Sequence, residues 1–209
     1  TLQDFVASGH WDHERMRDKT QQIVATQQAH PRAIGIIDES GNPKKGYETC
    51  GVHRQWCGNT GKVDNSVVAV HLGYAVGDFQ CLLDSDLYLP EAWAQDRERR
   101  EKAKVPEEVV FRTKPEIALS QVERALGNGL RFSSFTFDEL YGRSGPFLDG
   151  LSGLGQNFVG EIPCDFVGWT QPPKILVKPT PVNLRQKGRK RHFTRLSRQS
   201  LSVCEVRNL

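Results

Sequence analysis

One amphipathic helix, predicted over residues 113–129, divides this chain into two sets of strand-like segments and so limits the folds open to it. Thr113 can cap the helix, Pro115 suits its first turn, and a Gly-Asn-Gly stop follows its apolar face. Strand-like segments lie before it, within 33–89, and after it, within 132–162. A strand that follows a helical crossover normally lies parallel to a strand already in the sheet. The order therefore predicts an α/β fold with a mixed sheet flanked by helices.

The segments before the helix predict the antiparallel part of that sheet. The apolar run 33–37 stops at an Asp-Glu pair, and β-branched or aromatic segments follow at 47–56, 66–75 and 79–89. Their connections are short and rich in Gly, Asn and Asp, whereas a parallel crossover needs a dozen or more residues. We therefore expect a three-strand antiparallel meander in this region, with the acids at the end of its first strand.

Two aspartates, Asp38 and Asp138, each follow a predicted strand and each precede a glutamate. If their strands are parallel neighbours, both carboxylates emerge at one edge of the sheet, where open α/β sheets place their sites. Paired carboxylates repel, and hard oxygen ligands favour Mg²⁺ or Mn²⁺ as the ion between them. Strand alternation directs Glu39 and Glu139 to the other face. The alternative is that each aspartate is an ordinary turn or helix-cap residue.

Charge is distributed unevenly along the chain. Residues 171–209 hold ten Lys and Arg against one acid, whereas the preceding part holds 18 basic and 24 acidic residues. Such a tail predicts salt-dependent, sequence-independent contact with DNA, or alternatively a solvated segment. Lys44 and Lys45, after the first aspartate, are DNA-contact candidates or part of a solvated turn. The candidates in the tail are Arg185, Lys187, Arg189, Lys190 and Arg191.

The apolar runs, the first residues and the cysteines indicate in which cell compartment we expect the protein. The longest apolar runs, such as 66–75, are too short to cross a membrane, and the first residues lack the pattern of a secretory signal. The five cysteines are an odd, scattered number without a C-x-x-C pair. We therefore expect a cytoplasmic protein with reduced thiols and no membrane association.

An ordered series of sequence blocks resembles the DDE-superfamily transposases of bacterial insertion sequences, in particular the insertion-sequence 701 group. The similarity runs through residues 1–170. The blocks are IGIIDESGNPKKG, CGVHRQWCGNTGKVDNSVVAVHLGYA, DLYLPEAW, VPEEVVFRTKPEIALSQVERAL, FTFDELYG and FVGEIP.

The resemblance implies a ribonuclease H-like catalytic core over residues 31–170, preceded by the remnant of a helical region at 1–30 and followed by a basic extension at 171–209. It implies an Asp-Asp-Glu triad that uses Mg²⁺ or Mn²⁺ to cut DNA at transposon ends and join it to target DNA. Asp38 matches the first catalytic acid and metal ligand, and Asp138 matches the second. A homo-oligomer is compatible with this assignment.

The third acid has no convincing match in this chain. In the family it lies on a helix well beyond the last strand, whereas Glu161 falls in a predicted strand and Glu205 in the tail. We therefore expect a transposase fragment with weak or no cleavage of its own. One alternative is a non-catalytic DNA-binding or regulatory remnant, and another is a metal-dependent nuclease of the same fold without strand transfer.

Overall fold

The computed structural model describes residues 3–4, 12–176, 194–197 and 203–208. The chain forms two compact units, Thr1–Glu161 and Ile162–Leu209. The first contains the large sheet with Asp38 and Asp138, and the described residues of the second form short elements. In the part of the chain that the structure describes, no helix is long and apolar enough to cross a membrane.

The first unit is an α/β structure with one six-stranded mixed sheet. The strands are β1 (Ile34–Pro43), β2 (His53–Cys57), β3 (Lys62–Val76), β4 (Phe79–Leu87), β5 (Ser134–Phe137) and β6 (Phe158–Gly160). The helices are α2 (His13–Gln27), α3 (Glu91–Gln95), α4 (Arg97–Lys102), α5 (Lys114–Gly127), α6 (Glu139–Gly142) and α7 (Gly145–Gly153).

The strand order corrects the predicted meander. β1 pairs antiparallel with β3 and not with the segment that follows it in sequence. The reason is that β3, with 15 residues, is long enough to pair with β1 along one edge and with both β2 and β4 along the other. β5 then lies parallel to β1, and β6 lies parallel to β5, as the helical crossovers predict.

β1 also extends further than the sequence suggests. Its expected end was at Ile37, but the strand continues through Asp38 to Pro43, with Asp38 opposite His71 and Pro43 opposite Ser66. The polar Ser-Gly-Asn-Pro run resembles a turn, yet pairing with β3 keeps it extended. The first aspartate therefore lies inside a strand and not at its tip.

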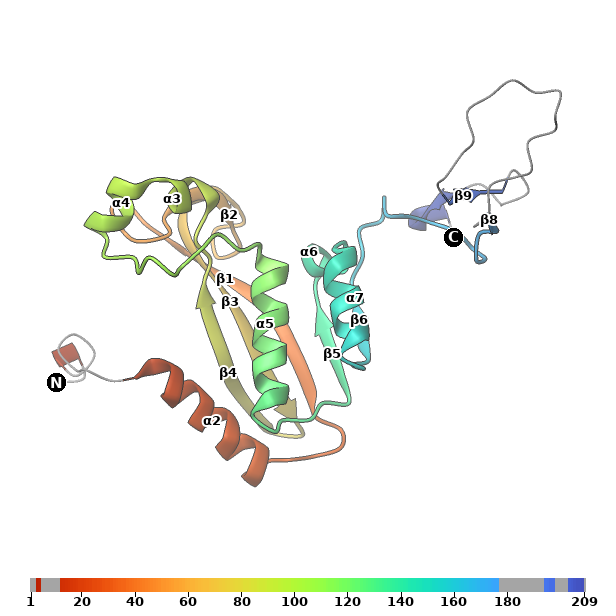
Figure 1. Ribbon diagram of the computed structural model, residues 1–209, viewed down its shortest axis with the longest axis horizontal. Coiled ribbons are helices and arrows are strands. Elements are labelled where there is room, and N and C mark those ends of the chain that lie inside the picture. Colours follow the sequence, from red (N-terminus) through yellow and green to blue (C-terminus); the bar gives the residue numbers. More distant parts are fainter. Residues whose placement is uncertain (1–2, 5–11, 177–193, 198–202, 209) are drawn as a thin grey trace, which may run out of the picture. The chain divides into compact units, whose positions relative to one another are not determined.

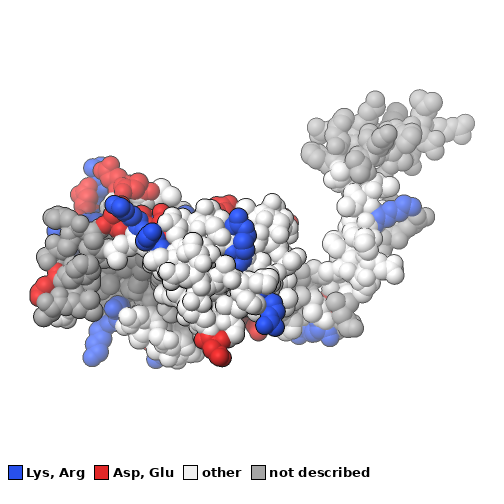
Figure 2. Space-filling model, turned by 90° about the horizontal axis from the view of Figure 1, so that it is seen from below, with Lys and Arg blue, Asp and Glu red and all other residues white. Residues whose placement is uncertain are grey.

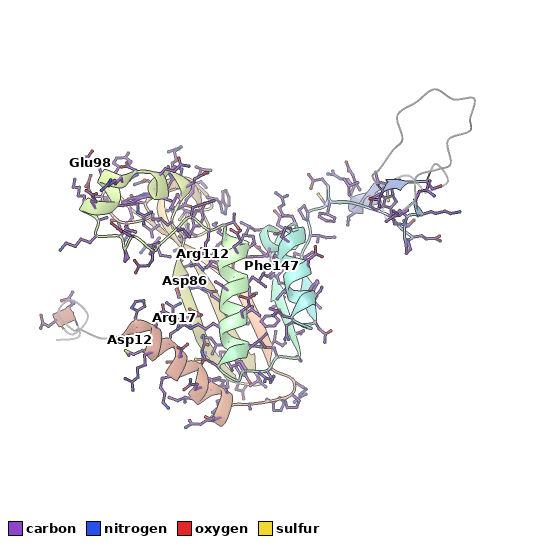
Figure 3. All side chains as sticks on the ribbon, viewed as in Figure 1. Asp12, Arg17, Asp86, Glu98, Arg112 and Phe147 are labelled. Carbon is purple, nitrogen blue, oxygen red and sulfur yellow. The ribbon has the colours of Figure 1, made fainter. Side chains whose placement is uncertain are left out.

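Four helices, α2, α5, α6 and α7, pack on one face of the sheet (Figure 1). α5 crosses in front of the strands, and it buries Ile117, Val122 and Ala125 in the main core. On α7, Phe147 points toward the sheet (Figure 3) and packs edge-on against Phe137, with ring centroids 5.1 Å apart. On the other face, apolar side chains remain 39–73% exposed; they include Ile34, Ile36, Leu82 and Val159. The sheet thus has one packed face and one open face.

The start of α5 confirms its predicted cap. The Thr113 side chain accepts a hydrogen bond from the Glu116 amide, and the Glu116 carboxylate accepts one from the Thr113 amide at 2.7 Å. This reciprocal capping box satisfies amides that the first turn would otherwise leave without partners.

The charged segment between β4 and α5 is partly buried. It forms α3 and α4, and Trp93 of α3 is fully buried with its indole nitrogen donating to the Val52 carbonyl at 2.7 Å. Trp93 also packs with Leu89 in a second small core. The charged segment therefore contains a buried tryptophan that attaches it to the rest of the unit.

In the second unit, the described strands are β7 (Val167–Gly168), β8 (Ile175–Leu176), β9 (Arg195–Leu196) and β10 (Cys204–Glu205), followed by the 3₁₀ turn η1 (Val206–Asn208). β7 pairs with β10, and β8 pairs with β9, both antiparallel.

Candidate functional site

The register of two parallel strands places Asp38 and Asp138 at the same level of the sheet. Ile37 on β1 pairs with Phe137, the last residue of β5; Asp38 continues β1, and Asp138 directly follows β5. Adjacent strands lie about 5 Å apart, so the two backbones are neighbours at this level. Asp38 is exposed and Asp138 half-buried. The sheet therefore brings together two acids that are a hundred residues apart in sequence.

Asp38 lies on the open face of the sheet, beside a His-Ser pair. Its cross-strand neighbour is His71, whose Nε2 is 2.7 Å from Oγ of Ser40. His71 Nδ1 is buried and has no hydrogen-bond partner in the described structure. Burial lowers the pKa of His71, and the negative charge of Asp38 opposes this shift. The imidazole is thus held close to a carboxylate with which it shares a face.

Asp138 also caps a helix. Its Oδ1 accepts a hydrogen bond of 3.0 Å from the Leu140 amide at the start of the one-turn helix α6. Oδ1 of Asp38 similarly accepts a hydrogen bond of 2.7 Å from the Glu39 amide. Among the described residues, neither Oδ2 atom has a hydrogen-bond partner, so one oxygen of each carboxylate remains available.

Glu39 faces the opposite side from Asp38, as strand alternation predicts. Lys114, the first residue of α5, donates from Nζ to Oε1 of Glu39 at 2.6 Å. Tyr141 of α6 donates from its hydroxyl to Oε2 at 3.0 Å. Tyr141 is fully buried, and burial, followed by the charge of Glu39, raises the pKa of its hydroxyl far above the ordinary value. Glu39 therefore has a cationic and a neutral donor, one for each oxygen.

The two aspartates fit a hard divalent cation as part of a ligand set. Within the described ranges, no group of three or more His, Cys, Asp or Glu side chains is arranged to hold a metal. Mg²⁺ is commonly bound by one or two carboxylates, with waters and substrate phosphate oxygens completing its shell. Oxygen donors at Asp38 and Asp138 suit that mode of binding, and Mn²⁺ accepts the same donors.

The remaining glutamates lie elsewhere. Glu161 comes directly after β6 and not inside it, and its amide bonds to the Phe137 carbonyl at 3.1 Å. Its side chain is exposed, one strand beyond Asp138. Glu139 is exposed on α6, because the strand ends before it and alternation no longer applies. Glu205 lies on β10 of the second unit and pairs with Arg207 at 2.8 Å.

The predicted DNA-contact residues divide into two groups. Lys44 and Lys45 follow β1 directly, and since Asp38 lies inside that strand, Lys44 is roughly 20 Å from it along the extended backbone. The other five fall outside the described residues: Arg185, Lys187, Arg189, Lys190 and Arg191. In the view of Figure 2, the Lys and Arg side chains of the first unit are spread among Asp and Glu side chains.

Sequence reasoning missed the partners of Glu39 and the pairing of His71 with Ser40. Lys114 is separated from Glu39 by 75 residues and belongs to a different element, so no local pattern links them. A weak signal existed for His71, since a histidine in a strand beside the first acid-bearing strand lies within reach of that acid.

Comparison with known proteins decides the family. Residues 1–207 match the profile of the family described as DDE superfamily endonuclease. This chain belongs to the DDE superfamily endonucleases. A relative of this family member, described as a probable transposase for insertion sequence element IS701 from Microchaete diplosiphon, is 30% identical over 206 residues. The match covers 98% of this chain and 50% of the relative, so the chain spans about half the relative's length. No solved structure gives a significant match.

Proposed function

We propose that this chain carries two acids of the catalytic centre of a DDE transposase, with Asp38 and Asp138 as ligands of a catalytic Mg²⁺ or Mn²⁺. One observation supports the proposal, namely the parallel register of β1 and β5, in which Ile37 pairs with Phe137 and an aspartate follows each of them. Family membership supports the same assignment.

The chemistry follows from the position of these residues. Divalent ions bound here would activate the oxygen that attacks a DNA phosphodiester and stabilise the one that leaves. Asp38 and Asp138 would hold ligand oxygens in fixed positions, because β1 is fixed by its pairing with β3 and Asp138 by its cap on α6. The uncovered face, to which Asp38 points, gives the DNA backbone a route to both carboxylates.

The strand order supports a ribonuclease H-like core as the finer description of this fold. Three antiparallel strands, β4, β3 and β1, continue into β5 and β6, which run parallel to β1. α5 connects the antiparallel strands to the parallel pair, and α6 and α7 connect β5 to β6. We place this core at 31–170, the helical remnant at 1–30 and a DNA-binding basic extension at 171–209.

Strand cleavage and transfer at insertion-sequence ends belong to the whole protein in this proposal. The third acid of the family triad would come from outside this chain, which spans half of its relative. The chain alone should then cleave DNA weakly or not at all. DNA at transposon ends and targets is the proposed partner, the homo-oligomer remains part of the proposal, and the cytoplasm is the proposed location.

Metal titration tests the two-acid site. Mn²⁺ or Mg²⁺ is added to the purified chain, and the thermal unfolding midpoint is compared for wild type, Asp38→Asn and Asp138→Asn. An ion that binds only the native state raises the midpoint by mass action, so we expect a rise for wild type and little or none for either variant. Each variant without metal should unfold at or above the wild-type midpoint, since one of two repelling charges is gone.

The outcome distinguishes this function from its alternative. A rise of equal size in all three proteins would show that the ion binds elsewhere. No rise in any of them would favour a non-catalytic DNA-binding remnant, and DNA affinity unchanged by Asp38→Asn would then support that alternative.

A further inference from the structure

We propose that Glu39, Lys114 and Tyr141 form a positioning network that sets the distance between Asp38 and Asp138. We call these three residues the Glu39 network. The inference rests on the proposed metal site and adds to it residues that bind no metal. None of them needs to contact DNA or an ion, since they act through the backbone that carries the two acids.

The network connects the three elements that surround the two acids. Glu39 is the next residue after Asp38 on β1, and its side chain points away from the open face. Tyr141 lies on α6, the helix that Asp138 caps, and Lys114 begins α5. The Tyr141 hydroxyl donates to one oxygen of Glu39 at 3.0 Å, and the Lys114 amine donates to the other at 2.6 Å. A single carboxylate thus ties both acid-bearing segments to one helix.

Burial makes these contacts specific. The side chains of Lys114 and Glu39 are only 14% and 15% exposed, and Tyr141 is fully buried. A buried carboxylate needs donors for its oxygens, and removal of one leaves a charge that is costly to keep in place. Burial and the charge of Glu39 also raise the pKa of Tyr141, so its hydroxyl stays protonated and donates throughout the physiological range.

α6 depends on such contacts more than the sheet does. It has only four residues, and a single helical turn is not stable by itself. β1, in contrast, is held by ten paired positions with β3. Loss of a contact to Glu39 should therefore displace Asp138 with α6 and leave Asp38 in its strand. The separation of the carboxylates would change without unfolding the protein.

The test uses Tyr141→Phe, which removes one hydroxyl and keeps the ring. The matched control is Tyr74→Phe, because Tyr74 is also buried and also donates one hydrogen bond, to the Gln28 carbonyl at 2.7 Å. Mn²⁺ affinity is measured by titration of the full chain. Loss of a hydrogen bond made to a metal ligand itself typically weakens binding by roughly 10-fold or more, and the Tyr141 hydroxyl acts one step further out, through Glu39. We therefore expect a loss of up to about 10-fold for Tyr141→Phe and unchanged affinity for Tyr74→Phe, while the urea midpoints of the two variants fall to a similar extent.

Substitutions of Lys114 provide a second test, in which a conservative variant should restore Mn²⁺ binding. Lys114→Met should weaken Mn²⁺ binding like Tyr141→Phe, and Lys114→Arg, which keeps the charge opposite Glu39, should restore most of it. Wild-type Mn²⁺ affinity in both Tyr141→Phe and Lys114→Met would overturn the proposal, as would equal weakening in Tyr74→Phe, which would indicate a general loss of stability.

A readout without metal separates this inference from the proposed function. The Gly142 amide donates to the Asp138 carbonyl at 3.0 Å and reports on α6. We expect its hydrogen exchange to accelerate in Tyr141→Phe, while amides of β3 keep their protection. If wild type binds no Mn²⁺, the proposed function fails, and hydrogen exchange alone then tests the Glu39 network. Equal protection of the Gly142 amide in wild type and Tyr141→Phe would overturn the proposed network.

Discussion

At the scale of single residues, the most buried charged side chain among the described residues lies away from Asp38 and Asp138. Asp84 on β4 is 2% exposed and accepts hydrogen bonds from Arg17 at 2.7 Å and from Gln21 at 3.3 Å, both on α2. Figure 3 shows Arg17 reaching from α2 toward β4, where Asp86 lies beside it at 3.0 Å. Burial raises the pKa of Asp84 more than the charge of Arg17 lowers it. This contact joins α2 to the sheet.

We expect Arg17→Met to lower the free energy of unfolding by about 3 kcal/mol at pH 7, because it leaves Asp84 buried without its cation. A carboxyl whose pKa is raised in the folded state contributes most below its unfolded pKa, near 4, and loses that contribution as the pH rises through the folded value. Without Arg17 the folded pKa of Asp84 rises further. The deficit of the variant should therefore be smaller at pH 4.5 than at pH 7 in urea denaturation.

Arg97→Met is the control for that experiment. Arg97 pairs with Glu101 at 2.9 Å, but their side chains are 91% and 67% exposed, so the pair should contribute little at either pH. A deficit of Arg17→Met that is independent of pH would contradict the assignment of Asp84.

Prediction at the residue scale succeeded for the strand pairing on which the proposed site depends. Asp38 and Asp138 were placed side by side by the rule for crossovers, and the register agrees. Lys114 and the Tyr141 hydroxyl were not identified as partners of Glu39, because their contact depends on how α5 and α6 pack over the sheet. The role of Asp138 as a helix cap was also foreseen, and it coexists with an available oxygen on the same carboxylate.

At the scale of elements, α5 was predicted almost to the residue and β1 was not. Both ends of α5 are set by local sequence, its start by the cap at Thr113 and its end by the Gly-Asn-Gly run at 127–129. The end of β1 is set by a distant partner, since pairing with β3 continues to Pro43. The neighbour of β1 in the predicted meander was wrong for the same reason, because β1 pairs with the long β3 and not with β2, whereas the antiparallel pairing of β2 with β3 and of β3 with β4 was correct.

The cap of α5 gives a prediction at this scale. Thr113→Ala removes the hydroxyl that accepts from the Glu116 amide, and loss of such a cap typically costs about 1 kcal/mol. We expect that loss in the free energy of unfolding by urea. Thr20→Ala on α2 is the control, because the exposed Thr20 hydroxyl bonds only to the Met16 carbonyl of its own helix. An equal effect of both substitutions would show that the cap adds nothing beyond ordinary helix propensity.

At the scale of the whole molecule, the asymmetry of charge predicts how DNA affinity depends on salt. Replacing Arg185, Lys187, Arg189, Lys190 and Arg191 with Gln removes five positive charges. Each lost phosphate contact reduces the slope of log affinity against log salt by about 0.9, so the slope should fall by up to about 4.5. Fluorescence anisotropy with duplex DNA between about 50 and 200 mM salt measures it.

The double variant Lys44→Gln/Lys45→Gln is compared with the five-fold variant. It should reduce the slope of log affinity against log salt by no more than about 2. An unchanged slope in the five-fold variant would remove the basic extension from the DNA interface. Sequence alone supplied this prediction, since a count of charges does not depend on the fold.

The unequal backbone support of the two acids has a consequence for how this family can diverge. Asp38 is built into a ten-residue strand, where an insertion would shift every later pair with β3. Asp138 lies at the junction between a four-residue strand and a four-residue helix, where a small change in the turn displaces one carboxylate and leaves the sheet intact. In the proposed metal site, a change of ion or of DNA geometry would therefore be accommodated more easily by a shift of Asp138 than by a shift of Asp38.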